Sequence, residues 1–303
     1  MLPLAAPIWY DYDMNVVTQD LYEAVLARRS IRRYDSQPLD EQTLDRVREI
    51  ISSVEPLIGE NEFHVLLRSA PPGAHLAQDL GGYGRIVNPP HYLVPYLLGD
   101  EHVLVDAGYR GEQISVHLAA LGIGSCFIGA LRREAEVRAR YALPDAARIG
   151  AFLVLGRPSS TLGGRATNRL MRLTSGANRK LSSGRLFFDG SFDKPALPPE
   201  RIAPLLEAAR HAPSAINAQP WRFLWLDERL FLFVTRGNRL YGTGPQSQYR
   251  FHDGGAAMAN ITLAMEALGL EGHWTPLEAA GTHLPEPPAN LQLVATLTLG
   301  DKD

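Results

Sequence analysis

Hydrophobic and polar positions follow the same order twice along this chain. Residues 34–56 run from an aromatic-Asp loop through a Pro-bearing turn into a helix with apolar positions at i, i+3 and i+4, and residues 188–214 do the same. Acidic residues or Pro stand where each helix begins, as helix N-termini favour. Short apolar runs typical of strands follow at 63–67 and 222–226. The pattern predicts helix, loop, helix, strand, strand, long helix, short strand and strand in each half.

Two longer stretches strengthen this repeat. Each reads Asp-x-Gly, then an apolar run of helical period, then Ala-Leu-Gly, and they begin at Asp106 and Asp253. Each leads to a short strand that ends in Leu-Gly, at 151–156 and at 292–300. Similar units of roughly 150 residues indicate a duplicated domain and not a solenoid, whose units are far shorter.

The repeat predicts an α+β fold of two tandem halves, each with a central antiparallel-type sheet flanked by helices. Two similar halves are expected to pack as an intramolecular pseudo-dimer, the covalent counterpart of a symmetric homodimer. The Ser/Gly/Arg-rich segment 158–169 is the predicted boundary. We therefore expect an N-terminal extension over 1–17, a first half over 18–160 and a second half over 161–303.

Composition narrows the classes of function. The net charge is -3, which offers no overall attraction to nucleic acid or to an anionic membrane. The single cysteine, Cys126, excludes an internal disulfide and a cysteine metal site. The N-terminus lacks the basic region of a signal peptide, and no apolar run approaches the ~18–20 residues of a membrane span. We expect a cytoplasmic protein with a small-molecule substrate, whose start is Met1 or Met14.

A basic cluster closes the first predicted helix, with Arg28, Arg29, Ser30 and Arg32 inside a few residues. One interpretation is a solvated helix end, where cations favour the helix dipole. The other is a phosphate site, because guanidinium groups bind phosphate oxygens in pairs and a hydroxyl adds a donor. The cluster alone does not decide between them.

A polar loop precedes the strand at 222–226 and reads Pro-Ser-x-x-Asn-x-Gln-Pro-Trp over 213–221. Such a loop can simply cap a helix and a strand. The matching stretch of the first half, 55–63, lacks this pattern. A purely structural loop should need similar chemistry in both copies, so the asymmetry favours a function for the second one.

Gly122-x-Gly124 resembles a dinucleotide fingerprint, but that motif needs a strand before the glycines and a helix after them. Here a helix precedes and a strand follows, so we reject that interpretation. Small residues at this point let backbone N–H groups approach a flat ligand closely. Cys126, within the apolar run, is interpreted as a small core residue and not as a nucleophile.

Taken together, these clusters resemble the nitroreductase family of flavoproteins over nearly all of the chain after about residue 18. The matching motifs are Arg28-Arg29-Ser30-x-Arg32-x-Tyr34-Asp35, Ala212-Pro213-Ser214-x-x-Asn217-x-Gln219-Pro220-Trp221, Ala120-Leu121-Gly122-x-Gly124 and Leu155-Gly156-x-Pro158. The usual family member is a homodimer in which one subunit's Arg segment and the other's Pro-Ser loop share an FMN. Here the two motifs lie in different halves, so the resemblance implies a fused pseudo-dimer with one FMN site.

The resemblance also implies the role of each site residue. Phosphate and ribityl contacts would come from one group: Arg28, Arg29, Ser30, Arg32, Arg157 after Gly156, Arg165 and, near the ribityl or flavin C2 carbonyl, Arg85. Ring contacts would come from Phe127, Ile128 and Gly129 on one side, with the Gly129 N–H at flavin N5, and from Pro213, Ser214, Asn217 and Gln219 on the other.

The implied activity is ping-pong hydride transfer from NAD(P)H through FMN to nitroaromatic, quinone or related acceptors. No catalytic side chain and no metal are expected, and a monomer should suffice. A second FMN site is predicted to be empty, because it would need the diluted basic block 179–185 and the loop 55–61. Two alternatives stay open: an FMN-storing protein without NAD(P)H turnover, and a specialised flavin dehydrogenase or flavin-fragmenting enzyme on the same fold.

Overall fold

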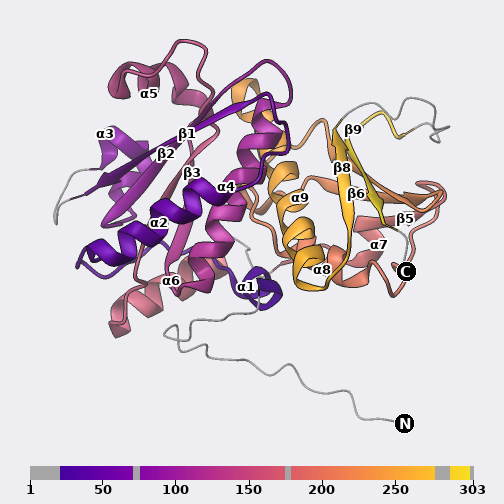
Figure 1. Ribbon diagram of the computed structural model, residues 1–303, viewed down its shortest axis with the longest axis horizontal. Helices are drawn as coiled ribbons and strands as arrows, with labels where there is room; N and C mark the ends of the chain where they lie inside the picture. The colour runs from indigo at the N-terminus through magenta and orange to yellow at the C-terminus, as the bar shows by residue number, and fades with distance from the viewer. Residues whose placement is uncertain (1–20, 71–75, 175–178, 277–286, 301–303) are drawn as a thin grey trace, which may run out of the picture.

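The computed structural model describes residues 21–70, 76–174, 179–276 and 287–300. Two sheets stand on either side of a central layer of helices (Figure 1). The first sheet contains β1 (Glu62–Ser69), β2 (His91–Leu98), β3 (Gly124–Gly129) and β4 (Ala151–Gly156). The second contains β5 (Phe187–Asp189), β6 (Trp221–Leu226), β7 (Arg229–Thr235), β8 (Gly272–Pro276) and β9 (Leu291–Leu299).

The two sheets share one strand order. The first runs β1-β2-β4-β3 and is antiparallel throughout. The second runs β5-β6-β7-β9-β8, and only the short β5 is parallel to its neighbour. Without β5, the second order repeats the first strand for strand. The predicted α+β class with two halves is therefore confirmed.

Nine α-helices lie in the part of the chain that the structure describes. They are α1 (Leu21–Ala27), α2 (Glu41–Ser53), α3 (Ala77–Leu80), α4 (Val103–Ala120), α5 (Glu134–Tyr141), α6 (Leu162–Thr174), α7 (Ser183–Leu186), α8 (Ala203–His211) and α9 (Tyr249–Ala267). Short 3-10 turns occupy η1 (Gly81–Arg85), η2 (Leu131–Arg133), η3 (Ala215–Asn217) and η4 (Gly244–Gln248). None of the described helices is both long and apolar enough to span a membrane.

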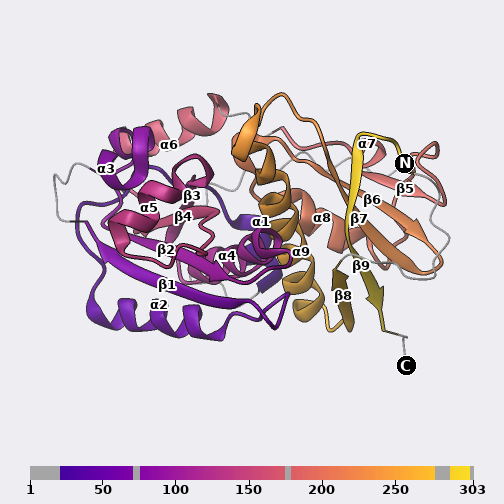
Figure 2. The same cartoon turned by 90° about the horizontal axis from the view of Figure 1, so that it is seen from above.

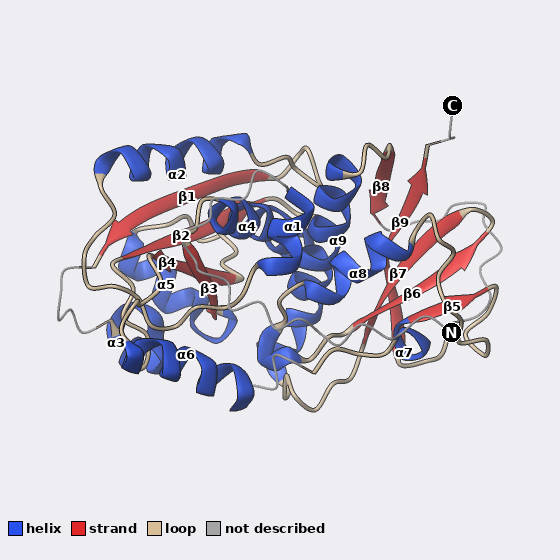
Figure 3. Cartoon of the chain, turned by 90° about the horizontal axis from the view of Figure 1, so that it is seen from below, coloured by secondary structure: helices blue, strands red, loops and turns tan. Residues whose placement is uncertain are grey.

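The helix α2 shows how the sequence pattern produces an element. The Asp40 carboxylate accepts a hydrogen bond from the Thr43 backbone N–H at 2.8 Å and so caps the helix N-terminus. Leu44 and Val47 point inward from its apolar side and pack on one face of the first sheet. Figure 3 shows α2 lying along β1, and α2 shares its face of the sheet with α4.

The long helices α4 and α9 pack against each other in the centre of the molecule, as Figures 1 and 2 both show. Both are buried on nearly all sides, as expected for helices enclosed between two sheets. A Cβ on Gly108 would lie 1.9 Å from the His252 carbonyl oxygen, and one on Gly255 would lie 1.9 Å from the Val105 oxygen. The glycine of each Asp-x-Gly motif is therefore required by this crossing.

Each half has its own core. In the first half, β4 sends Phe152 and Val154 to one face of its sheet and Leu153 and Leu155 to the other, and both faces are covered. The second half packs Trp221 of β6 and neighbouring strands under α8 and α9. Burial on both faces explains why the β4 segment is an unbroken apolar run.

Three features differ from the sequence pattern or extend it. The aromatic-Asp loop of the second half forms the parallel strand β5, and helix α5 lies between β3 and β4. Helix α6 begins just beyond the predicted boundary yet packs on the first half, because Asn168 accepts hydrogen bonds from the Arg32 and Arg33 N–H groups. The predicted boundary stays a prediction, and the predicted extension over 1–17 lies outside the described residues.

Candidate functional site

Arg28 joins the basic cluster of the first half to the second half. It follows directly on α1, and its Nε lies 2.8 Å from Oε1 of Glu112 on α4. Its Nη2 donates a hydrogen bond to the His211 carbonyl oxygen at 3.1 Å. Both side chains of the ion pair are buried. The end of α1 therefore meets the C-terminal end of α8, two residues before the second-half polar loop.

The rest of the basic cluster runs along the edge of β3. The Ile31 N–H donates to the Ser125 carbonyl oxygen at 2.8 Å, and Ser30 forms a bridge with the same residue. One guanidinium nitrogen of Arg32, Nη1, is buried and has no hydrogen-bond partner among the residues that the structure describes. An unpaired buried guanidinium N–H costs free energy, and an anionic ligand would satisfy it.

Positive charge is concentrated where the halves meet. Burial, followed by the charges of Arg28, Arg29 and Arg210, lowers the pKa of Lys180 to about 7. Burial likewise raises the pKa of Glu112 to about 7, although the nearby Arg28 opposes this. Mutual repulsion between the cations would be relieved by a bound anion.

His211 stands among the same cations. Burial and then Lys180, Arg29 and Arg210 lower the pKa of its imidazole to about 3. The ring is therefore neutral at physiological pH. Its backbone carbonyl, and not its side chain, makes the hydrogen bond to Arg28.

The second-half polar loop, 213–219, is fixed by a buried carboxylate. Oδ2 of Asp253 accepts hydrogen bonds from the Ala215 N–H at 2.8 Å and from the Tyr241 hydroxyl at 2.7 Å. The Ser214 hydroxyl accepts a further bond from the Gln219 N–H at 3.0 Å. The aspartate of the second Asp-x-Gly motif thus positions the loop.

The amides of Asn217 and Gln219 are directed to residues 179–185, which lie between the elements of the two halves and are called the linking segment here. Both donate to the Arg179 carbonyl oxygen, at 3.1 and 2.7 Å, and Gln219 Oε1 accepts from the Leu181 N–H at 3.0 Å. They line a cavity of about 580 Å³ together with Lys180. Their predicted contact with a flavin ring stays a prediction, since these polar contacts are with the linking segment.

The predicted opposite wall of the ring lies at the end of β3. Phe127 packs edge-on against His252 of α9, with ring centroids 5.5 Å apart, and the Ile128 side chain is buried in the first-half core. Gly129 is exposed, and a Cβ there would come within 2.1 Å of the Tyr249 hydroxyl. The start of α9 therefore approaches the backbone that was expected to face flavin N5.

The other predicted residues are more dispersed. A Cβ on Gly156 would lie 2.5 Å from Pro90, so close packing requires this glycine. Arg157 pairs with Asp40 at 3.2 Å on the surface, and Arg165 is exposed on α6. Pro213 is half-buried at the loop start, and the side chain of Arg85 lies outside the described part of the chain.

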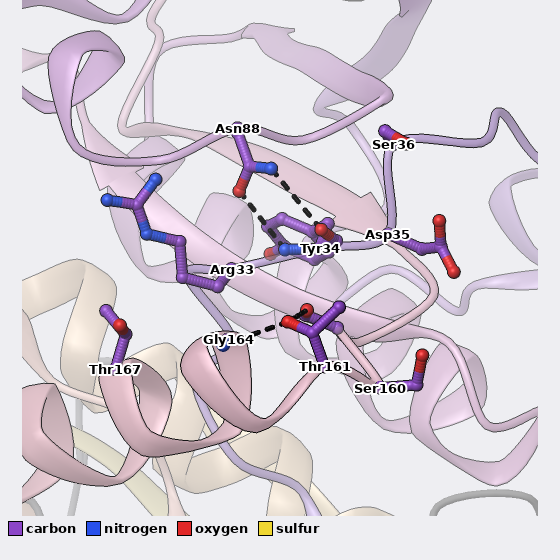
Figure 4. Close-up of a pocket in the computed structure, with 10 residues that line it drawn as sticks. Arg33, Tyr34, Asp35, Ser36, Asn88, Ser160, Thr161, Gly164 and Thr167 are labelled. Atoms are coloured by element: carbon purple, nitrogen blue, oxygen red, sulfur yellow. Dashed lines mark hydrogen bonds between the residues drawn. The ribbon is translucent and has the colours of Figure 1, made fainter.

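A second cavity, of about 380 Å³, lies beside the start of α6 (Figure 4). Asn88 accepts from the Tyr34 N–H on one side, and the Gly164 N–H donates to Thr161 on the other. Arg33 lines this cavity, whereas Arg28, Ser30 and Arg32 line neither of the two cavities. Adjacent arginines of the basic cluster thus have different surroundings.

The sequence did not single out Glu112, Lys180 or Tyr249. The sequence did offer a reason to examine Lys180, because it is one of only three lysines in an arginine-rich chain. Glu112 lies in the same helical run as Asp106 and Arg110, and a charged residue within a largely apolar run is a signal for a buried charge with a partner. Tyr249 carried no signal, since its approach to Gly129 depends on how the two halves pack.

Comparisons with known proteins agree with the two-half fold. The family model described as "Putative TM nitroreductase" matches residues 20–243, which are 224 of the 303 residues. A crystal structure of a "putative nitroreductase" from Thermotoga maritima covers 97% of this chain and 99% of its own, with a TM-score of 0.56 and 19% identity. No curated protein matches the chain significantly.

Two further solved structures align with about half of the chain. Nitroreductase A from Vibrio parahaemolyticus covers 48% of this chain and 70% of its own, at 20% identity and a TM-score of 0.41. The NADPH:FMN oxidoreductase from Vibrio harveyi, solved with NAD+, covers 46% and 70%, at 19% identity and a TM-score of 0.40.

The two-half α+β fold and the family model over residues 20–243 define the class of protein as nitroreductase-like. This chain belongs to the nitroreductase family and is an oxidoreductase.

Proposed function

We propose that this oxidoreductase binds one FMN per chain and transfers electrons from NAD(P)H to nitroaromatic, quinone or related acceptors in a ping-pong cycle. The observation that carries the proposal is the contact between Arg28 and the His211 carbonyl. It joins the basic cluster of one half to the end of α8, two residues before the Pro-Ser loop of the other half, and a shared flavin site would need these two motifs close together.

The residues at this junction fit the phosphate end of the cofactor. Arg32 offers a buried guanidinium nitrogen without a partner in the described part of the chain, and Ser30 stands two residues before it. FMN, when bound, supplies a ring that can accept a hydride from one small molecule and deliver it to another. Arg28, Ser30 and Arg32 would bind and orient its phosphate and ribityl chain.

Residues of both halves would border the ring. Phe127 and the Gly129 backbone stand on the first-half side, while Pro213 and Ser214 stand on the second. Asp253 orients the latter pair by holding the Ala215 N–H. No side-chain acid or base is assigned, because a hydride relay needs none.

Two observations support a single FMN per chain. The backbone of the basic segment 179–185, which a second site would need, is bonded to the loop at 213–219, and its Lys180 lies near Arg28 and Arg29 at the first junction. The loop at 55–61, the other part of a second site, is closed by Arg110, whose Nη2 donates to the Ile58 and Asn61 carbonyl oxygens. We propose that one chain therefore suffices as a cytoplasmic monomer.

The test is to denature the purified protein, count the released FMN, and then titrate the holoenzyme anaerobically with NADPH and NADH. One FMN per chain, bleached by nicotinamide and restored by a nitroaromatic or quinone, is expected. Two per chain would contradict the single site. Bound flavin that neither nucleotide reduces would contradict the NAD(P)H activity and favour storage or a specialised dehydrogenase.

A matched pair of variants locates the phosphate contact. Arg32→Gln should lose FMN, because it removes the unpaired buried guanidinium nitrogen. Arg33→Gln should retain FMN, because the Arg33 side chain lines the cavity beside the start of α6 and is not part of the proposed phosphate site. Equal FMN contents in the two variants would remove Arg32 from the proposed site.

A further inference from the structure

The cavity beside loop 213–219 is lined by three cations and by no carboxylate. Its ten lining residues are Arg179, Lys180, Leu181, Ser182, Arg185, Ile216, Asn217, Ala218, Gln219 and Leu240. Arg179, Lys180 and Arg185 form no ion pair with any residue that the structure describes. A chain of net charge -3 thus places uncompensated positive charge in one cavity, which indicates an anionic ligand.

The loop that forms one wall is held in a costly conformation. Ile216, Asn217 and Gln219 have φ angles of 54°, 55° and 45°, in the left-handed region that non-glycine residues avoid. The strain is greatest for the β-branched Ile216, and such strain collects at ligand sites. The bonds from Asp253 and from the Asn217 and Gln219 amides hold the loop in this shape.

The conformation places apolar side chains at the rim of the cationic cavity. Ile216 is 62% exposed, and Leu240, which also lines the cavity, is 51% exposed. A ligand that combines phosphate groups with a flat apolar ring would use both surfaces. Guanidinium forks and an ammonium bind phosphate oxygens, and exposed apolar side chains pack on the face of a purine.

The cavity adjoins the proposed flavin site through one residue. Lys180 lines the cavity, and its charge also interacts with Arg28, Arg29 and Glu112 on the first-half side. The volume, about 580 Å³, lies within the range of ~300–1,000 Å³ of small-molecule sites. A dinucleotide could therefore place its adenosine end here while its other end reaches towards the flavin.

We propose that this cavity binds the adenosine end of the reduced dinucleotide, with Arg179, Lys180 and Arg185 on its 2′-phosphate, so that the enzyme prefers NADPH to NADH. The inference rests on the proposed function for the role of the dinucleotide. The binding site itself can be tested without turnover.

The test is calorimetric titration of the FMN-loaded holoenzyme with 2′,5′-ADP and, in parallel, with 5′-AMP. We expect 2′,5′-ADP to bind at least about tenfold more tightly, because each charge-assisted hydrogen bond is worth about a factor of ten in affinity. Lys180→Gln and Arg185→Gln should each weaken 2′,5′-ADP by about tenfold and 5′-AMP by much less.

Two control variants separate a local contact from long-range charge. Lys194→Gln removes the same charge from an exposed lysine, and Arg46→Gln removes an exposed arginine on α2, both outside the cavity. Both should bind 2′,5′-ADP as the wild type does. Equal weakening in all four variants would overturn the proposal.

Further outcomes distinguish this site from the flavin site. Equal affinity of the wild type for 2′,5′-ADP and 5′-AMP overturns the proposal, as does loss of FMN from Lys180→Gln and Arg185→Gln, which would assign the cavity to the flavin phosphate. A holoenzyme that binds 2′,5′-ADP through these residues but is not reduced by NADPH supports the site and refutes the proposed function.

Discussion

The loops at 55–61 and 213–219 occupy equivalent places in the two halves and are anchored in the same way. Each precedes the first antiparallel strand of its half, and each gives a backbone N–H to the aspartate of an Asp-x-Gly motif. Leu57 donates to Asp106 at 2.9 Å, and Ala215 donates to Asp253 at 2.8 Å. The duplicated motif therefore has a duplicated structural role.

The loops differ in what surrounds the anchor. Four residues beyond Asp106 stands Arg110, which pairs with that carboxylate and covers the first loop. Four residues beyond Asp253 stands Ala257, which cannot do so. The second loop instead adopts left-handed angles and directs its amides to the linking segment. The comparison teaches that a buried arginine closes the first loop within its own half, whereas the second loop is strained and is bonded to the segment 179–185.

The largest effect expected from this comparison is on stability. Asp106→Ala leaves Arg110 buried without its partner, which costs about 3–5 kcal/mol. Asp253→Ala leaves the Ala215 N–H and the Tyr241 hydroxyl without an acceptor, at about 1–3 kcal/mol for each group. Urea unfolding of the FMN-free proteins measures both losses.

The variants Asp106→Ala and Asp253→Ala also distinguish a role in stability from a role in FMN binding. Folded Asp106→Ala protein should retain FMN, while Asp253→Ala should bind it more weakly, because only the second loop borders the proposed site. Asp253→Asn, which keeps an oxygen acceptor, should be milder than Asp253→Ala. If Asp106→Ala released FMN and Asp253→Ala did not, the roles assigned to the two loops would be wrong.

The crossing of α4 and α9 gives the next largest effect. Gly108→Ala and Gly255→Ala each force a methyl group against a backbone oxygen, so overpacking should cost about 1–3 kcal/mol in each case. The two losses should be similar, since each glycine faces the other helix. Thermal unfolding measures both losses. A loss confined to one variant would show that the two close contacts do not contribute equally to the packing of α4 against α9.

A pH dependence tests the linking segment. Lys180 has its pKa lowered to about 7 by burial and by Arg28, Arg29 and Arg210, with Glu112 opposing. The ammonium is charged below that pH and can hold an anion, whereas it is neutral above it. Affinity for 2′,5′-ADP should therefore fall as the pH rises from 7 to 9, by about tenfold. Lys180→Gln should bind with little change over that window.

The smallest effect is expected in the closed loop. Gly59 has no heavy atom within 4 Å of an added Cβ and is exposed, so Gly59→Ala should change stability by less than about 0.5 kcal/mol and leave FMN bound. Asn217→Ala in the other loop should weaken FMN or dinucleotide binding. Equal sensitivity to the two changes would indicate symmetric sites.

Much of the fold could be predicted from the sequence, because it depends on local periodicity. The apolar run at 151–156 is β4, and the helix expected within residues 34–56 is α2. The Asp-x-Gly repeat indicated equivalent helices, although not that the glycines allow them to cross. The need for glycine depends on contacts between residues about 150 positions apart, and sequence periodicity does not reveal such contacts.

The candidate site could be predicted only in part, for the same physical reason. The motifs predicted that Arg28 and the Pro-Ser loop share one site, and in the structure Arg28 contacts His211, two residues before that loop, while the shared flavin stays a prediction. The ion pair between Arg28 and Glu112 of α4 could not be predicted, because a sequence does not show which buried charges meet. Likewise, the sequence predicts that the segment 179–185, which carries Lys180, is a diluted basic block of a second site. In the structure, Lys180 instead lies near Arg28 and Arg29.

The two crossing helices belong to one polypeptide, so a substitution can alter one half of the protein without altering the other. In a symmetric homodimer every substitution appears twice, so a change in one loop is always copied in the other. Here Arg110 could arise over one loop while the other stayed open. Covalent linkage also keeps the halves together on dilution, so retention of a ligand held between them should not depend on protein concentration.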